Sequence, residues 1–334
     1  MNISTSDLKR FQRLSSPITG KNILPILDYV KIGGGRIVKS VLTSFVQFDC
    51  NSADEDMLVE ENLLNIKIGK SANPTLKFSK KGNKVTITDS VVPTTDQTMD
   101  IKEFPTIPEP TSERFPVSEN FLKVLQKAQH FPAKYDPQNI SWMSFIMIGD
   151  GYVCASDGHA FFMEPVDEEF KVVLDNRNAQ ILSKMPINGY AFSDNYMFFY
   201  GDGFTIGFGK QEIGYTNISG YGNINGSKME FTASASDFQR FNDECAQSSK
   251  LPWITISKGK VSMNDKDYDR LVEMPMPSVT PSDMFTYNAK TMNRLLMAIG
   301  GDEIEFYRGK DWYWIKSPSE KSTTLLMKLL DDGI

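Results

Sequence analysis

The stretch Ala155-Ser-Asp-Gly-His-Ala-Phe-Phe-Met163 lies near the middle of the 334-residue chain. Two apolar runs precede and enter it, Trp142–Ile148 and Tyr152–Ala155, and they are separated by the turn Gly149-Asp150-Gly151. Short apolar runs on either side of a glycine-containing turn predict β-strands joined in a hairpin. The polar triplet Asp157-Gly158-His159 is therefore predicted to close a hairpin. Taken alone, the triplet indicates a turn with a satisfied histidine.

The same construction occurs six times along the chain. Glycine-bearing turns separate apolar or alternating runs at Gly33–Gly35, Lys81–Asn83, Gly149–Gly151, Gly201–Gly203, Lys258–Lys260 and Arg308–Lys310, and such turns predict hairpins. Segments with helical spacing precede the hairpins at Ser6–Leu14, Val59–Ile68, Glu119–Phe131, Asn176–Met185, Ala235–Gln247 and Ala289–Ile299. The order of helix and then strands thus repeats six times, at intervals of roughly 50–60 residues.

Two such repeats amount to about 110 residues, which is a normal domain size. A proline-rich segment, Phe104–Pro110, stands near one third of the chain, and the Gly/Asn/Ser-rich segment Gly220–Ser227 stands near two thirds. The sequence therefore predicts an α+β protein of three similar domains, 1–112, 113–226 and 227–334, each built from two helix-plus-hairpin halves.

Composition is that of a soluble folded protein, with 40% hydrophobic and 23% charged residues. No apolar run approaches the roughly 20 residues needed to span a bilayer, and the N-terminus lacks the features of a signal peptide. We therefore expect a cytoplasmic protein. Cys50, Cys154 and Cys245 are far apart without metal-ligand spacing, and only His130 and His159 are histidines, so no metal site is expected.

Positive charge is segregated on four of the predicted helices, although the net charge of the chain is −6. Apolar side chains share one side of each helix, and the other side carries Lys9, Arg10, Arg13, Lys123, Lys127, Arg177, Lys184, Lys290 and Arg294. The segments 59–68 and 235–247 do not share this bias. Exposed helix faces often carry charge, but they usually mix both signs. This pattern leaves open whether the basic faces are functional.

Motifs that support catalysis are not found in the chain. The glycines of 220–226 have the wrong spacing for a dinucleotide-binding loop and predict a linker instead. Asp157 and His159 could suggest acid–base chemistry, but nothing nearby in the sequence supplies a nucleophile. We therefore expect a protein that is not an enzyme and has no cofactor. An unrelated α+β enzyme that uses Asp157 and His159 remains one alternative.

Four short motifs resemble the beta sliding clamp of the bacterial replicative polymerase, the DNA polymerase III beta subunit family. Ile23-Leu-Pro-Ile-Leu27 follows a basic helix and loop as in the first clamp domain, and Glu103-Phe-Pro105 is similar to the motif that closes that domain. Ala155-Ser-Asp-Gly-His159 resembles the Ala-Thr-Asp-Gly-His of the second domain. Leu325-Leu-Met-Lys-Leu329 resembles the strand that closes the third.

The resemblance implies a DNA-clamp fold assembled as a head-to-tail homodimeric ring around duplex DNA, with sheets outside and helices lining the hole. The basic helix residues would then attract phosphates without reading bases. Lys21 matches a loop position that touches DNA in the family. The partners of such a ring would be duplex DNA, the polymerase catalytic subunit and the clamp loader. The ring would act as a processivity factor.

The resemblance also implies a cleft for short partner peptides between the second and third domains. Ser156, Gly158, His159 and Phe161 would form one wall, and Leu325, Leu326, Met327, Lys328 and Leu329 the other. Ala160 and Leu326 depart from the family pattern. The alternative within this fold is a monomeric adaptor that binds partner peptides without encircling DNA.

Overall fold

The computed structural model describes residues 1–18, 24–51, 55–89, 92–136, 138, 141–250, 252–265 and 270–328. These residues form two compact units. Unit 1 comprises Met1–Val117 and Lys184–Lys210, and unit 2 comprises Ser118–Ser183 and Gln211–Ile334. The chain thus crosses between the units three times.

Six α-helices occur in the described residues, and each begins where a polar side chain caps the backbone. Ser4, Glu60, Ser118, Asp175, Ser234 and Asn288 each accept a hydrogen bond from a backbone N–H in the first turn, which satisfies donors that a helix start leaves open. The helices are α1 Thr5–Ser15, α2 Glu61–Lys70, α3 Glu119–Ala128, α4 Asn176–Leu182, α5 Ala235–Ser248 and α6 Ala289–Ile299.

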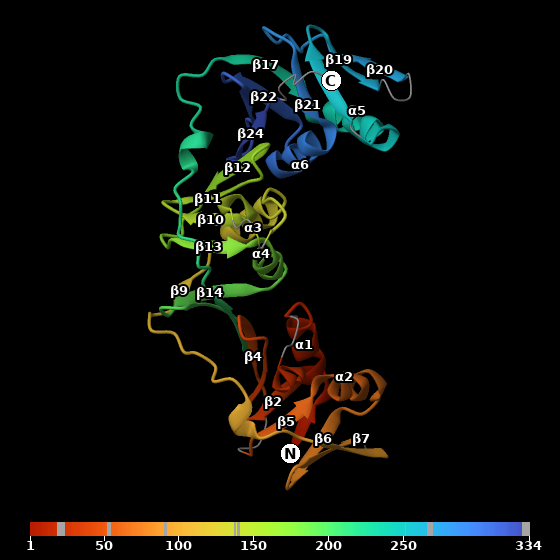
Figure 1. Ribbon diagram of the computed structural model, residues 1–334, viewed down its shortest axis with the longest axis vertical. Helices are drawn as coiled ribbons and strands as arrows, with labels where there is room; N and C mark the ends of the chain where they lie inside the picture. The colour runs from red at the N-terminus through yellow and green to blue at the C-terminus, as the bar shows by residue number, and fades with distance from the viewer. Residues whose placement is uncertain are drawn as a thin grey trace. The chain divides into compact units, whose positions relative to one another are not determined.

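Each helix belongs to a β-α-β-β-β repeat, with one short strand before the helix and three strands after it (Figure 1). Repeats 1 and 2 contain β1 Asn2–Ser4, β2 Tyr29–Gly33, β3 Arg36–Ser40, β4 Ser44–Asp49, β5 Met57–Glu60, β6 Thr75–Lys81, β7 Lys84–Asp89 and β8 Val92–Gln97. Repeats 3 and 4 contain β9 Phe115–Pro116, β10 Phe145–Gly149, β11 Tyr152–Ser156, β12 Ala160–Pro165, β13 Val172–Asp175, β14 Ile187–Phe192, β15 Tyr196–Gly201 and β16 Phe204–Gly209. Repeats 5 and 6 contain β17 Met229–Ser234, β18 Trp253–Ser257, β19 Lys260–Asp265, β20 Arg270–Pro275, β21 Phe285–Asn288, β22 Glu303–Arg308, β23 Trp312–Lys316 and β24 Thr323–Met327.

All six hairpins expected from the sequence are confirmed. The six turns join β2 to β3, β6 to β7, β10 to β11, β15 to β16, β18 to β19 and β22 to β23, and every pair is antiparallel. At Asp150 and Gly151 of the third turn the backbone is left-handed, with φ of 54° and 80°, a conformation that favours glycine and aspartate.

The short first strand of each repeat pairs within the sheet of its neighbouring repeat. β1 pairs with β6 and β5 with β2, and the same exchange joins repeats 3 and 4 and repeats 5 and 6. This exchange joins the repeats in pairs, 1 with 2, 3 with 4 and 5 with 6. The compact units divide the chain elsewhere, because one of their three crossings falls between α4 and β14, so the boundaries near 112 and 226 stay a prediction.

Third strands of the repeats join these small sheets into larger ones. In unit 1, β4 pairs with β16 and gives the eight-stranded order β5-β2-β3-β4-β16-β15-β14-β9. In unit 2, β12 pairs with β24 and gives the order β13-β10-β11-β12-β24-β23-β22-β17. The sheets of repeats 2 and 5 remain four-stranded, with the orders β1-β6-β7-β8 and β20-β19-β18-β21.

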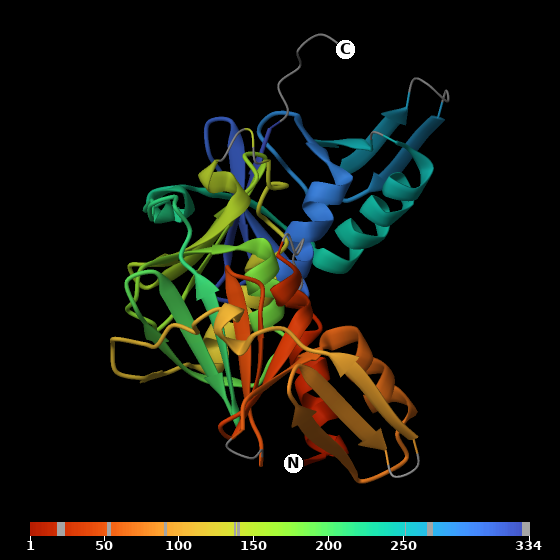
Figure 2. The same ribbon diagram turned by 60° about the horizontal axis from the view of Figure 1, so that its bottom comes forward.

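Helix packing follows the apolar stripes read from the sequence. On α1, Leu8, Phe11 and Leu14 are buried while Lys9 and Arg13 are exposed. Figure 2 shows α1 beside α2 in unit 1 and α5 beside α6 in unit 2. Apolar helix faces thus turn towards neighbouring elements, and the basic faces turn away from the core.

Helix boundaries differ by up to three residues from those expected, and three of the differences concern residues discussed above. Val59 and Glu60 belong to β5, because Val59 pairs with Val30 and the Glu60 carboxylate caps α2 by accepting from Leu63 N. Helix α3 ends at Ala128 rather than at Phe131, and α4 ends at Leu182 rather than at Met185. Lys184 therefore lies beyond its helix.

Candidate functional site

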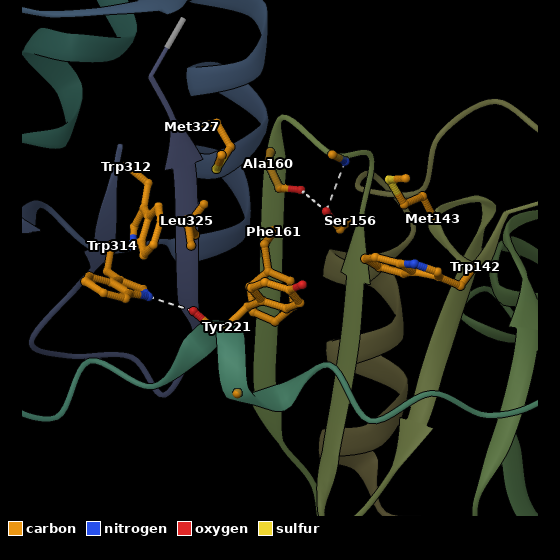
Figure 3. Close-up of a pocket in the computed structure, with 12 residues that line it drawn as sticks. Trp142, Met143, Ser156, Ala160, Phe161, Tyr221, Trp312, Trp314, Leu325 and Met327 are labelled. Carbon is orange, nitrogen blue, oxygen red and sulfur yellow. Dashed lines mark hydrogen bonds between the residues drawn. The ribbon is translucent and has the colours of Figure 1, made fainter. Parts of the chain in front are cut away.

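A groove of about 330 Å³ lies in unit 2 at the junction of β12 and β24. Figure 3 shows its labelled side chains, with the turn η4 (Ser219–Gly222) in front of the strands and helices behind them. Its lining is aromatic, apolar or small and uncharged, comprising Trp142, Met143, Ser156, Gly158, Ala160, Phe161, Gly220, Tyr221, Trp312, Trp314, Leu325 and Met327. The groove therefore suits an uncharged apolar segment.

One wall of the groove is held in place by a tryptophan of β23. Trp314 Nε1 donates to Tyr221 O over 2.7 Å, and Tyr221 is exposed in the turn η4. Gly222 lies so close to Met163 that an added Cβ would be 2.4 Å from the Met163 methyl carbon. The segment expected to be a linker is thus a packed part of the site.

The opposite wall is the turn between β11 and β12. Ser156 Oγ donates to Ala160 O over 2.7 Å and accepts from Gly158 N at 3.1 Å. Asp157 Oδ1 accepts from both His159 N and Ala160 N, at 2.9 and 2.8 Å. Two short polar side chains therefore fix this turn through its own backbone, as Asp and Ser side chains commonly do.

Arg294 of α6 holds the same turn from outside. Its Nη2 lies 2.6 Å from Asp157 Oδ2, and its Nη1 donates to His130 O over 3.1 Å. Burial and the nearby Arg294 charge lower the pKa of His130, which keeps this imidazole neutral at neutral pH. Asp157 is thus committed to two backbone N–H groups and a guanidinium.

A second cavity, of about 290 Å³, shares Met327 with the groove. It is lined by His159, Trp253, Asn288, Thr291, Leu326 and Met327. His159 is exposed, and its carbonyl accepts from Met327 N over 3.0 Å. The groove is therefore continued past Met327 by a cavity with more polar walls.

Residues expected in the cleft are divided between these two cavities. Ser156, Gly158, Phe161, Leu325 and Met327 line the groove, whereas His159 and Leu326 line the second cavity. Phe161 is only 3% exposed and forms part of the floor. The Lys328 backbone N–H donates to Asp311 O and its side chain lines neither cavity, and Leu329 lies outside the described residues.

Sequence reasoning missed most of the aromatic lining. Trp312 and Trp314 alternate along β23 and therefore share one face of the sheet, a pattern that is also typical of ordinary strand packing. Trp142 and Met143 lie in the turn η3 (Trp142–Ser144), in a run expected to be a strand, and Tyr221 lies in the segment expected to be a linker. Trp312 and Trp314 lie near β12 because β12 pairs with β24.

Six of the helix cations are exposed and three have carboxylate partners. Lys9, Arg13, Lys123, Arg177, Lys184 and Lys290 are exposed. Arg10 pairs with Asp202 of the β15–β16 turn at 3.3 Å, Lys127 with Glu164 and Glu320 at 3.0 and 3.2 Å, and Arg294 with Asp157. Lys21 lies outside the described residues.

Comparison with protein-family models gives no match, and no curated protein matches the chain. Solved structures do match over nearly the full length. A Bacillus subtilis DNA polymerase sliding clamp has a TM-score of 0.85 at 14% identity, with 98% of each chain covered. The DNA polymerase III subunit beta of Pseudomonas aeruginosa has a TM-score of 0.84 at 15% identity, covering 98% of this chain and 99% of that chain.

The chain therefore has the fold of the DNA polymerase III beta subunits, the sliding-clamp fold. A Streptococcus pneumoniae DNA polymerase III beta chain shares it, with a TM-score of 0.83 at 13% identity over 98% of this chain and 99% of that one. In the described part of the chain, no helix is long and apolar enough to cross a membrane, and no cluster of three potential metal ligands occurs.

Proposed function

We propose that the protein is a DNA sliding clamp, a non-catalytic processivity factor that encircles duplex DNA as a homodimeric ring. Its groove would tether the polymerase catalytic subunit and other replication factors, and a clamp loader would place the ring on DNA. The observation that carries the proposal is the pairing of third strands between repeats, which leaves one third strand with a free edge in each unit.

The two strands with a free edge, β8 and β20, occupy equivalent places in their repeats. Repeats 1 and 4 join through β4 and β16, and repeats 3 and 6 join through β12 and β24. The corresponding strands of repeats 2 and 5 are β8 and β20, and each is the edge of a four-stranded sheet. Pairing β8 of one copy with β20 of another would build the same eight-stranded order a third time. Two such contacts close a head-to-tail dimer.

Helix charge agrees with this division of the repeats. The exposed cations lie on or beside α1, α3, α4 and α6, the helices of the four repeats whose sheets are joined. Helices α2 and α5 belong to the free-edged sheets and carry acids such as Glu61 and Asp243. We propose the six exposed cations, with Lys21, as contacts to DNA phosphates, and a structural part for Arg10, Lys127 and Arg294.

Retention on DNA tests the proposal. A ring should remain on circular duplex after loading and leave when the circle is cut, because linear ends let it slide off. Its association should weaken steeply with salt, since phosphate contacts release counterions. Replacing Lys9, Lys123 and Lys290 by Ala should reduce DNA association further at every salt concentration. Equal retention on linear and circular DNA would refute the ring.

We propose the groove as a binding site for griselimycin, because its lining is apolar and two solved clamps of this fold, from Pseudomonas aeruginosa and Bartonella birtlesii, are bound to griselimycin. We expect it to bind this chain, and Tyr221→Ala with Met327→Ala to weaken that binding about tenfold or more by removing apolar contact area. Isothermal titration measures the affinity. The exposed Lys258→Ala variant serves as control, and an unchanged affinity in the double variant would contradict the groove assignment.

A monomeric adaptor is the alternative, and one observation favours it. Both cavities lie wholly within unit 2, so a partner peptide could bind without a second copy. Sedimentation at micromolar concentrations separates the two functions. A monomer at every concentration that still binds the probe would be an adaptor.

A further inference from the structure

The backbone groups that face the two free edges can be assigned from the ladders beside them. Thr98 N donates to Asn83 O in register with β7 and β8. Antiparallel ladders alternate, so the even-numbered residues of β8 bond to β7 and the odd-numbered ones face the free edge. Met276 N donates to Gly259 O in register with β19 and β20, and the odd-numbered residues of β20 likewise face outward.

Equivalent positions on β4, β8 and β12 follow from the hairpins. In each repeat, a loop joins the first two of the three strands that follow the helix. The first residue after this loop is Arg36, Lys84 or Tyr152. These residues pair with Asp49, Gln97 and Pro165 on the last strand of the repeat. The residue one place earlier on each third strand is therefore equivalent. These residues are Phe48, Asp96 and Glu164.

The same construction relates β16, β20 and β24. Tyr196, Lys260 and Trp312 follow the first hairpin loops, and they pair with Gly209, Pro275 and Met327. Counting back five places gives three equivalent residues, Phe204, Arg270 and Ser322.

Both observed junctions use one register between these equivalent positions. In unit 1, Phe48 is directly opposite Phe204. In unit 2, the pair Met163–Thr323 continues to Glu164 and Ser322, whose side chains are joined by a 2.7 Å hydrogen bond. The remaining member of this series would place Asp96 opposite Arg270.

We propose that β8 of one copy pairs with β20 of a second copy in this register, with Asp96 opposite Arg270, Thr94 opposite Val272 and Val92 opposite Met274. The proposal rests on the proposed ring and specifies how its subunits meet. It assigns an intersubunit ion pair to two residues that have no ion partner in the described residues.

Side-chain chemistry at both edges fits a second copy. Val92 is 60% exposed and Leu271 is 63% exposed, and each would be covered in the paired state, which explains two large apolar side chains at sheet edges. Asp96, Thr94 and Val92 would stand in non-hydrogen-bonded pairs, in which opposing side chains approach most closely. Charge and apolar contact would therefore reinforce the same register.

Two prolines at the strand edges increase the share of dimer stability that the opposing side chains must supply. Pro93 and Pro275 occupy odd-numbered positions, so each lacks the N–H that would face the other copy. The intersubunit ladder therefore lacks the two hydrogen bonds that these N–H groups would have donated. We therefore expect the Asp96–Arg270 pair to contribute strongly and the dimer to weaken as salt rises.

Charge reversal in the full-length protein tests the pair, with sedimentation velocity over a concentration series as the measurement. Asp96→Arg alone and Arg270→Asp alone should each weaken the dimer about tenfold or more, because like charges would meet at both interfaces. Mixing the two variants should restore a dimer, since each interface then holds opposite charges. Glu113→Arg, which reverses an exposed charge outside both strands, should leave the dimer as in the wild type.

Disulfide trapping tests the register itself. Val92→Cys combined with Met274→Cys should give a crosslinked dimer on oxidation, because directly opposed residues have disulfide spacing. Thr94→Cys combined with Met274→Cys reports the register shifted by two residues and should crosslink poorly. The three natural cysteines are present in both variants and provide the background.

The outcomes separate the register from the ring. The register is wrong if the wild-type protein is a dimer but the two single variants associate normally, or if mixing them does not restore a dimer. The proposed ring would not be affected by either result. Stronger crosslinking of the shifted pair would likewise overturn the register alone. A wild-type protein that stays monomeric at every concentration and does not crosslink overturns both.

Discussion

The two eight-stranded sheets share one plan but differ in what covers the face away from their helices. In unit 1, the segment after β8 brings Phe104 onto that face, where it is 8% exposed among Ile26, Leu27, Val38 and Leu58. In unit 2, the corresponding segment after β16 packs Ile218 and Tyr221 but leaves the 330 Å³ groove (Figure 3). One strand order thus gives a filled face in one case and a candidate docking site in the other.

The junction strands differ as well. Where β4 pairs with β16, Phe48 lies opposite Phe204. The ion pair beside this junction joins Arg10 of α1 to Asp202 of the β15–β16 turn, and the Asp202 side chain is 93% exposed. Across β12 and β24, Glu164 is 5% exposed and bonds to Lys127 and Ser322. A buried polar network specifies one arrangement more strictly than apolar contact does, and we suggest that it keeps the groove walls in register.

Removing the aromatic plug of unit 1 should have the largest effect. Phe104→Ala should lower the free energy of unfolding by about 3–5 kcal/mol, because it removes a buried ring and leaves a cavity. Urea unfolding with hydrogen exchange of the β3 and β5 peptides measures the loss in unit 1. Phe104→Leu should cost less, and a loss below about 1 kcal/mol for the alanine variant would show that the segment does not fill this face.

The next prediction compares how much the Lys127–Glu164 and Arg10–Asp202 ion pairs contribute to the free energy of unfolding. Lys127→Ala should cost about 3 kcal/mol, because Glu164 would be left buried without its cation. Arg10→Ala should cost less than about 1 kcal/mol, since its partner Asp202 is solvated. Both are measured by urea unfolding, and equal losses would mean that burial does not distinguish the junctions.

The smallest expected effect concerns the reactivity of two buried thiols, Cys154 in the cluster beneath the groove and Cys245 on α5. Burial raises the pKa of Cys154 to about 12, and burial together with the charge of Glu244 raises that of Cys245 to about 11. Both thiols therefore stay protonated at pH 8 and should react with iodoacetamide far more slowly than in urea, as mass spectrometry would show. Fast labelling of native Cys154 would indicate that the sheet below the groove opens.

Local patterns predicted the six helices and the six hairpins, but not the short strand that precedes each helix. Glycine-bearing turns located all six hairpins, and apolar residues at helical spacing located the six helices. The ends of α3 and α4 were misplaced because their last apolar residues pack against neighbours outside the helix. Strand β5 was missed for a similar reason, since its pairing with β2 outweighs a helical pattern.

The candidate site was predicted only in part. Resemblance identified Ser156, Gly158 and Met327, but it could not separate the groove from the second cavity. The aromatic wall from Trp312, Trp314 and Tyr221 depends on strands far apart in the sequence. Helix spacing placed Lys127 and Arg294 on basic faces and could not show that Lys127 meets Glu164 and Glu320 or that Arg294 meets Asp157.

The sequence by itself determined the sixfold repeat, the hairpins, the helices and the segregation of charge, because turns, caps and periodicity act between residues close in the chain. Only the tertiary structure decided which repeats join, where a groove remains and which cations are neutralised. Those outcomes depend on β12 meeting β24 and β4 meeting β16. Such long-range pairing is set by the packing of whole sheets, which no local pattern records.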